Sequence, residues 1–142
     1  MKNTRLLKIF SIIFVILTLV QSTVAEAVEW VSVTYNDNAK YYIDKHSIRK
    51  IQDNLIEFWV KINYSNPKES EDKSTKYLSE KNLVLLDCQK NTSKQPYAVF
   101  FSKSNGDGIV IGVYKNKRSS EIPINPESVA DFYRIYVCNF KS

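Results

Sequence analysis

Apolar and polar residues alternate along several short segments of the chain, and this period of two predicts β-strands. The clearest segment is 55–64 (LIEFWVKINY), in which every second residue from Ile56 to Tyr64 is apolar and is expected to face the core. The other set, which includes Trp59 and Lys61, is expected to face outward. Further strands are predicted at 30–35, 40–44, 77–89, 97–102 and 109–114.

Polar segments between these strands predict the turns. Asn36-Asp37-Asn38 and 52–54 have turn chemistry, and Asn105-Gly106-Asp107-Gly108 is a strong hairpin signal. Residues 45–50 are expected to form a short helical turn or loop, and the charged segment 66–74 an exposed loop. Connections this short favour an antiparallel, meander-like order of strands.

The last segment has a different period. Apolar residues recur at helical spacing from Val129 to Phe140, and Asn125-Pro126-Glu127 predicts a cap followed by a proline at the first helical position. Cys138 falls opposite the apolar stripe on an ideal helix. Either the helix ends near Tyr136, which we favour, or the cysteine reaches the sheet from one side. The predicted fold class is α+β: about six antiparallel strands with a C-terminal helix packed on them.

The first 27 residues have the three parts of a secretory signal peptide. A basic start is followed by the 12 residues Ile9–Val20, almost all apolar, and by Ala25-Glu26-Ala27 as a cleavage site. A membrane-spanning helix is the alternative, but it needs about 20 apolar residues. We therefore expect a single exported domain over 28–142 with no membrane span, and no N-terminal lipid anchor, since no cysteine lies near the cleavage site.

The charge and the cysteines narrow the function classes. The whole chain carries +5, of which residues 1–27 contribute +2, so the exported part is only weakly basic and shows no nucleic-acid footprint. In an oxidising compartment, Cys88 and Cys138 most simply form one disulfide, the alternative being two buried free thiols.

The sequence shows no enzymatic or cofactor-binding constellation. With the lone His46, the two cysteines cannot complete a zinc site unless carboxylates join them, and Asp107 lacks the other acidic ligands of a calcium loop. His46 lies close to Asp44 and Ser47 in the chain, but a catalytic triad is assembled in space, so we expect a solvated loop histidine. We predict no catalytic residue, no metal and no cofactor.

Basic residues around the predicted hairpin are the candidate ligand-binding site. Lys115, Lys117 and Arg118 follow its second strand, and Lys103 is expected across the hairpin from them. Such a patch suits acidic glycans or an acidic protein face. The simpler interpretation is a solvated loop.

Short motifs along the exported part resemble the surface-adhesin protein E family of Gram-negative bacteria. In chain order they are Glu29-Trp30-Val31, Tyr42-Ile43-Asp44, Ser47-Ile48, Trp59-Val60, Leu86-Asp87-Cys88, Pro123-Ile124, Pro126, Ser128 and Val137-Cys138. Each motif is weak alone, but their order and spacing are specific.

The resemblance implies an antiparallel sheet of about six strands with a helix tethered by a Cys88–Cys138 disulfide. It also implies binding of host extracellular-matrix and serum proteins, such as vitronectin, laminin and plasminogen, with a homodimer as the candidate assembly. The best-known member is an anchored lipoprotein, from which this chain departs.

We therefore expect an exported, non-enzymatic, adhesin-like protein that is periplasmic, secreted or at the cell surface. The alternative is a periplasmic accessory protein that binds a bacterial envelope partner. A small hydrolase would need a nucleophile–base pair that the sequence does not show.

Overall fold

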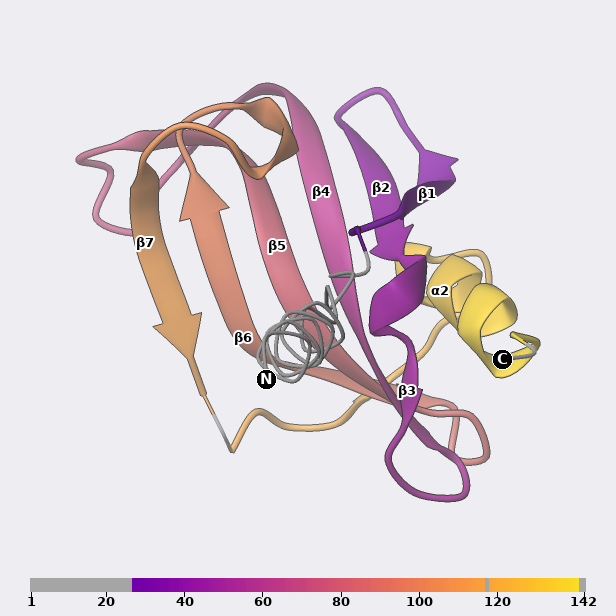
Figure 1. The fold of residues 1–142 in the computed structure, drawn as a ribbon. Helices are drawn as coiled ribbons and strands as arrows, with labels where there is room; N and C mark the ends of the chain where they lie inside the picture. Colours follow the sequence, from indigo (N-terminus) through magenta and orange to yellow (C-terminus); the bar gives the residue numbers. More distant parts are fainter. Residues whose placement is uncertain (1–26, 117, 141–142) are drawn as a thin grey trace, which may run out of the picture.

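A computed structural model describes residues 27–116 and 118–140 as one twisted sheet with one helix packed against it (Figure 1). Apart from Ala27, the predicted signal peptide lies outside these residues, as does Lys117. The strands are β1 (Trp30–Tyr35), β2 (Ala39–Asp44), β3 (Arg49–Lys50), β4 (Leu55–Glu69), β5 (Lys76–Asp87), β6 (Thr92–Phe101), β7 (Val110–Lys115) and β8 (Ile122–Pro123). Two 3-10 turns, η1 (Lys45–Ser47) and η2 (Ser104–Gly106), and the helix α2 (Val129–Cys138) complete the described fold.

The strands follow one another in the sheet in the order β1-β2-β4-β5-β6-β7, every pair antiparallel. This confirms the predicted meander. The two-residue strands β3 and β8, which pair with β4 and β6, were not predicted because two residues are too few to show a period. No helix among the described residues is both long and apolar enough to cross a membrane.

The first turn forms as its side chains predict. Asn36 Oδ1 accepts hydrogen bonds from the backbone N–H groups of Asn38 and Ala39, each at 2.9 Å. This local bonding lets β1 reverse directly into β2.

The prediction of a loop over 66–74 is wrong for residues 66–69, because β4 continues to Glu69. The register of β4 against β5 shifts between Asn63 and Lys68, and Pro67, which has no N–H to donate, lies in this irregular stretch. Only 70–75 turns back, and it is held by the Ser70 hydroxyl, which donates to Asp72 Oδ1 at 2.6 Å.

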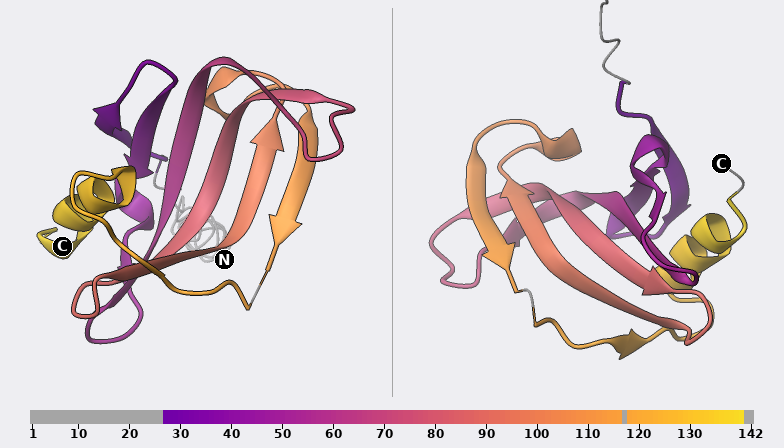
Figure 2. Two further views of the ribbon diagram at one scale, coloured as in Figure 1. Left: turned by 180° about the vertical axis from the view of Figure 1, so that it is seen from behind. Right: turned by 60° about the horizontal axis from the view of Figure 1, so that its bottom comes forward.

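The core lies between α2 and one face of the sheet. The predicted inward set of β4 is confirmed, since Phe58 and Val60 have no exposed surface. The Tyr133 ring of α2 packs edge-on against Phe58, with 6.0 Å between the ring centroids, and Val137 is 1% exposed one turn further on. The helix lies on the side of β1 and β2, packs on core residues of β4 and β5, and leaves the β7 side uncovered (Figure 2).

The start of the helix is not where the sequence predicts it. Ser128, rather than Asn125, is the cap: its hydroxyl oxygen accepts a hydrogen bond from Asp131 N at 3.2 Å. Pro126 lies before the helix because Glu127, with a φ of 63°, interrupts helical geometry. Asn125 instead uses its backbone carbonyl, which accepts from the Ser128 hydroxyl at 2.7 Å.

The end of the helix is also later than we expected. Helical geometry continues to Cys138, so the prediction that it stops near Tyr136 is wrong. Cys138 is joined to Cys88, which directly follows β5, and the predicted disulfide is confirmed. The cysteine therefore reaches the sheet from the side of the helix.

Candidate binding surface

The structure places the predicted basic residues at two separate ends of the β6–β7 hairpin. Lys103 directly precedes η2, at the end where β6 leaves the sheet. Lys115 is the last residue of β7 and pairs with Tyr97, its ammonium 5.7 Å from the ring centroid. Arg118 is exposed shortly after β7, and Lys117 lies outside the described residues. Lys103 therefore does not join Lys115 in one cluster.

Strand β7 is an exposed edge of the sheet. In the described part of the chain it pairs only with β6, so its other side presents unpaired backbone N–H and C=O groups. Its large side chains are unusually apolar for an edge: Val110 is 55% exposed, Val113 49% and Tyr114 45%. Together with Ile109, 70% exposed, they form a patch of the kind that proteins use for association.

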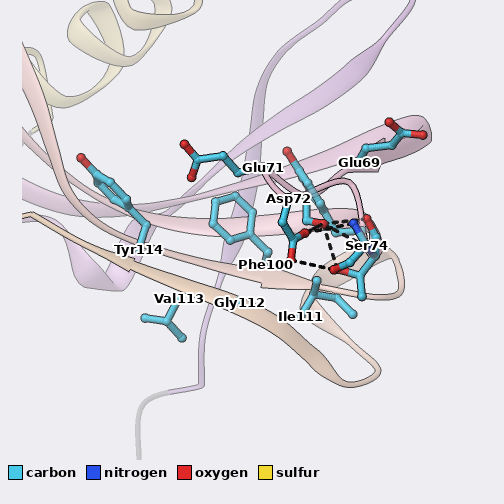
Figure 3. Close-up of a pocket in the computed structure, with 12 residues that line it drawn as sticks. Glu69, Glu71, Asp72, Ser74, Phe100, Ile111, Gly112, Val113 and Tyr114 are labelled. Atoms are coloured by element: carbon cyan, nitrogen blue, oxygen red, sulfur yellow. Dashed lines mark hydrogen bonds between the residues drawn. The ribbon is translucent and has the colours of Figure 1, made fainter.

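A cleft of about 650 Å³ adjoins this edge, between β6, β7 and the turn that joins β4 to β5 (Figure 3). Its base is aromatic. The rings of Tyr77 and Phe100 lie 4.9 Å apart, and the ring of Tyr64 lies 5.7 Å from that of Tyr77. Tyr114 and Ile111 of β7 line the other wall, so the cleft and the exposed edge form one continuous surface.

Acidic residues of the turn surround this aromatic base. Glu69, Glu71 and Asp72 line the cleft, and none of them has an ion-pair partner among the described residues. Hydrogen bonds from Ser70 and Ser74 lower the pKa of Asp72 to about 2, so this carboxylate stays charged in any physiological medium. A cationic, partly apolar segment has the chemistry that matches such a cleft.

The sequence pattern did not predict any residue of this cleft as part of a binding site. The available signals were the exposed apolar run 109–114 and the cluster of acids in 69–72. They lie about 40 residues apart in the chain, so only the sheet order could show that they share a wall.

The His46 ring is held by groups other than the nearby Asp44. Its Nε2 lies 3.2 Å from Glu29 Oε2, and its Nδ1 lies 2.9 Å from the carbonyl oxygen of Ala27. Asp44 instead accepts from the His46 backbone N–H at 3.2 Å. The carboxylate of Asp44 therefore does not orient the imidazole as it would in a triad.

Comparison with known proteins agrees with this fold. A family model described as surface-adhesin protein E matches residues 30–139. A crystal structure of Haemophilus influenzae protein E, crystal form II, has a TM-score of 0.61 at 17% identity, covering 81% of this chain and 94% of that one. Protein E from non-typeable Haemophilus influenzae has a TM-score of 0.59 at 18% identity, covering 80% and 78%.

A search of curated proteins found no match. At such identities the solved structures establish the fold alone, but the family match extends over most of the described chain. This chain belongs to the surface-adhesin protein E family.

Proposed function

We propose that the protein is an exported, non-enzymatic, adhesin-like binding protein whose partner is an extracellular-matrix or serum protein of a host. The observation that carries the proposal is the exposed apolar edge strand β7 beside the acidic, aromatic cleft. Membership in the adhesin family supports it. We further propose that β7 and the cleft form the binding surface.

An extended segment of the partner adds to the sheet along β7. Backbone hydrogen bonds to the free side of the strand supply affinity, and alternate side chains of the segment supply specificity. Apolar side chains of the segment pack against Val113 and Tyr114, which are half exposed in the free protein.

Charged residues at the two ends of the surface determine the direction in which the partner's extended segment lies along β7. Glu69 and Glu71 line the cleft, whereas Lys115 and Arg118 lie at and beyond the end of β7. A segment with a basic side chain over the cleft and an acidic one at the other end is complementary to both. This arrangement gives the predicted basic residues Lys115 and Arg118 a role in orientation.

The test compares two variants that place a charge on equally exposed apolar positions. Val113 of β7 and Ile135 of α2 are each 49% exposed, so neither Val113→Lys nor Ile135→Lys buries the new charge. Binding to immobilised matrix and serum proteins, and to a bacterial envelope extract in parallel, is measured for both. We expect Val113→Lys to weaken binding about tenfold or more, because a lysine at the edge opposes strand addition, and Ile135→Lys to bind normally.

Equal binding by both variants would refute the assignment to β7. Capture of an envelope protein only, together with fractionation to the periplasm, would replace the adhesin proposal with the periplasmic accessory role. A homodimer formed through β7 would appear as a dimer in sedimentation analysis that Val113→Lys dissociates.

A further inference from the structure

Two lysines lie directly opposite each other on the face of the sheet that α2 does not cover. Lys61 of β4 pairs with Lys81 of β5, so their side chains leave the sheet side by side. The alternation along β4 predicted that Lys61 faces outward. It does lie on the face away from α2, but the residue is only 6% exposed. Like charges at opposed positions destabilise a sheet, so this pair needs a physical explanation.

Aromatic rings from three other strands frame the two ammonium groups. Lys61 Nζ lies 4.7 Å from the centroid of the Trp30 ring and 4.7 Å from that of Tyr42. Lys81 Nζ lies 5.2 Å from the Phe101 ring and 5.9 Å from the same Trp30 ring. Both ammonium groups therefore lie over the same Trp30 ring, which places the two positive charges close together.

The rings do not satisfy the hydrogen-bonding capacity of these groups. Each ammonium has three N–H donors, and among the described residues neither Lys61 nor Lys81 forms a salt bridge or a hydrogen bond through its side chain. Burial, and then the charge of Lys81, lower the pKa of Lys61, while the more weakly acting Asp107 raises it. Two donors of like charge thus lie in a partly desolvated site, and no described residue accepts a hydrogen bond from either side chain.

The turn η2 packs against strands β4 and β5, beside the Lys81 side chain, and is itself fixed to the sheet. Asn63 Oδ1 accepts from Asn105 N at 2.7 Å, and the Ser79 hydroxyl oxygen accepts from Gly106 N at 2.9 Å. Gly106 has a φ of 76°, and a Cβ there would collide with Cε and Nζ of Lys81. The turn therefore leaves room for the Lys81 side chain and holds it toward Trp30.

We propose that Lys61 and Lys81 form a binding site for one oxyanion, the sulfate or carboxylate group of a small ligand. An oxyanion between the two ammonium groups accepts hydrogen bonds from both and replaces their repulsion with two charge-assisted contacts. Trp30, Tyr42 and Phe101 limit access of water and so strengthen these contacts. The site lies on the other face of the sheet from the cleft, so it does not depend on the proposed partner surface.

Titration of the protein with sodium sulfate and with sodium acetate tests this site. Sodium chloride at matched ionic strength controls for screening, and the indole N–H signal of Trp30 in two-dimensional NMR is the reporter. Trp59 supplies the second indole signal of the chain for comparison. We expect a saturable shift of the Trp30 signal with one or both salts and none with chloride. The salt that binds more tightly identifies the class of oxyanion.

Three variants locate the binding. Lys61→Met should abolish the saturable shift, and Lys81→Gln should weaken binding about tenfold, the loss of one hydrogen bond to a charged group. Lys40→Gln, on the neighbouring strand β2, should bind normally because Lys40 is exposed and lies over no aromatic ring of the described residues. If Lys61→Met does not fold, the test relies on Lys81→Gln, because Lys81 is only half-buried. A shift that does not saturate, or that is unchanged in Lys81→Gln, would overturn the proposal.

Discussion

Cys88 and Cys138 join the end of strand β5 to the last residue of α2. The helix is the only element that covers the buried face of the sheet in the described part of the chain, and the disulfide closes a loop between residues 50 apart. The disulfide therefore restricts the conformations of the unfolded chain and, in the folded protein, holds α2 against the core.

Removal of this disulfide should lower the free energy of unfolding substantially. By the chain-entropy estimate, a loop of this length contributes about 4 kcal/mol. We expect the double variant Cys88→Ala/Cys138→Ala to lose about that amount in urea denaturation. Parent protein treated with dithiothreitol is the matched control. A loss below about 1 kcal/mol in both would show that the helix packs equally well without its tether.

Tyr133 offers a test of helix packing on the sheet. Its ring packs on Phe58, and its buried hydroxyl has no hydrogen-bond partner within the described residues. Tyr133→Ala should cost about 3–5 kcal/mol in unfolding free energy through the cavity it leaves. Tyr133→Phe should be neutral or stabilising by about 1 kcal/mol, because it removes an unpaired buried group. A Tyr133→Phe variant that is less stable than the parent would show instead that a bound water satisfies the hydroxyl.

Much of this fold follows from local patterns. The alternation along 55–64 assigns the buried set of β4, and the number of cysteines predicts their bond. The burial of Lys61 could not be predicted from the alternation. A period of two separates the faces of a strand but does not show that Trp30, from the first strand, covers one of them.

The candidate binding surface was less predictable for the same reason. The basic residues were predicted to form one patch across the hairpin. Lys103 and Lys115 instead lie at its opposite ends, because Lys103 precedes η2 and Lys115 ends β7. The cleft depends on the extension of β4 to Glu69, which carries the acidic turn over Phe100. A charged segment with a proline normally indicates a loop. In residues 66–69 the pairing of β4 with β5 overrides that preference.

Glu80 should make stability depend on pH in an unusual direction. Burial raises its pKa above 4.5, although hydrogen bonds from Asn82, at 2.9 Å, and from Tyr64 oppose the rise. A raised pKa means that the folded state holds this proton more tightly than the unfolded state. The stabilisation that protonated Glu80 contributes is fully present below the pKa of Glu80 in the unfolded state. It is lost as the pH rises through the pKa of Glu80 in the folded state.

Comparison of Glu80→Gln with the parent isolates this effect. The variant should gain stability relative to the parent between pH 4 and pH 7, as measured by urea denaturation across that range. Asp87 and Asp131 have lowered pKa values, the first through hydrogen bonds from the backbone and the second through Arg134, and they act in the opposite direction. They titrate equally in both proteins, so their effect cancels in the difference. A difference that does not change with pH would contradict the raised pKa.

The basic residues at and beyond the end of β7 predict a salt-dependent contribution to partner binding. Neutralising Lys115, Lys117 and Arg118 together should weaken binding at low ionic strength and make it less sensitive to salt, because exposed charges act through screened, long-range attraction. Lys103→Ala should bind as the parent does, since Lys103 lies at the other end of the hairpin. Surface plasmon resonance from low to physiological salt measures both. Normal binding by the triple variant would remove these residues from the binding surface.

The start of α2 allows a direct choice between the predicted cap and the observed one. Ser128 satisfies the N–H of Asp131 through its side chain, so Ser128→Ala should cost about 1 kcal/mol in unfolding free energy. Asn125 contributes a backbone carbonyl, which an alanine retains, so Asn125→Ala should cost clearly less. Urea denaturation of the two single variants and of their combination measures the difference. A larger loss for Asn125→Ala would place the cap where the sequence pattern first indicated, and α2 would then begin before the left-handed Glu127.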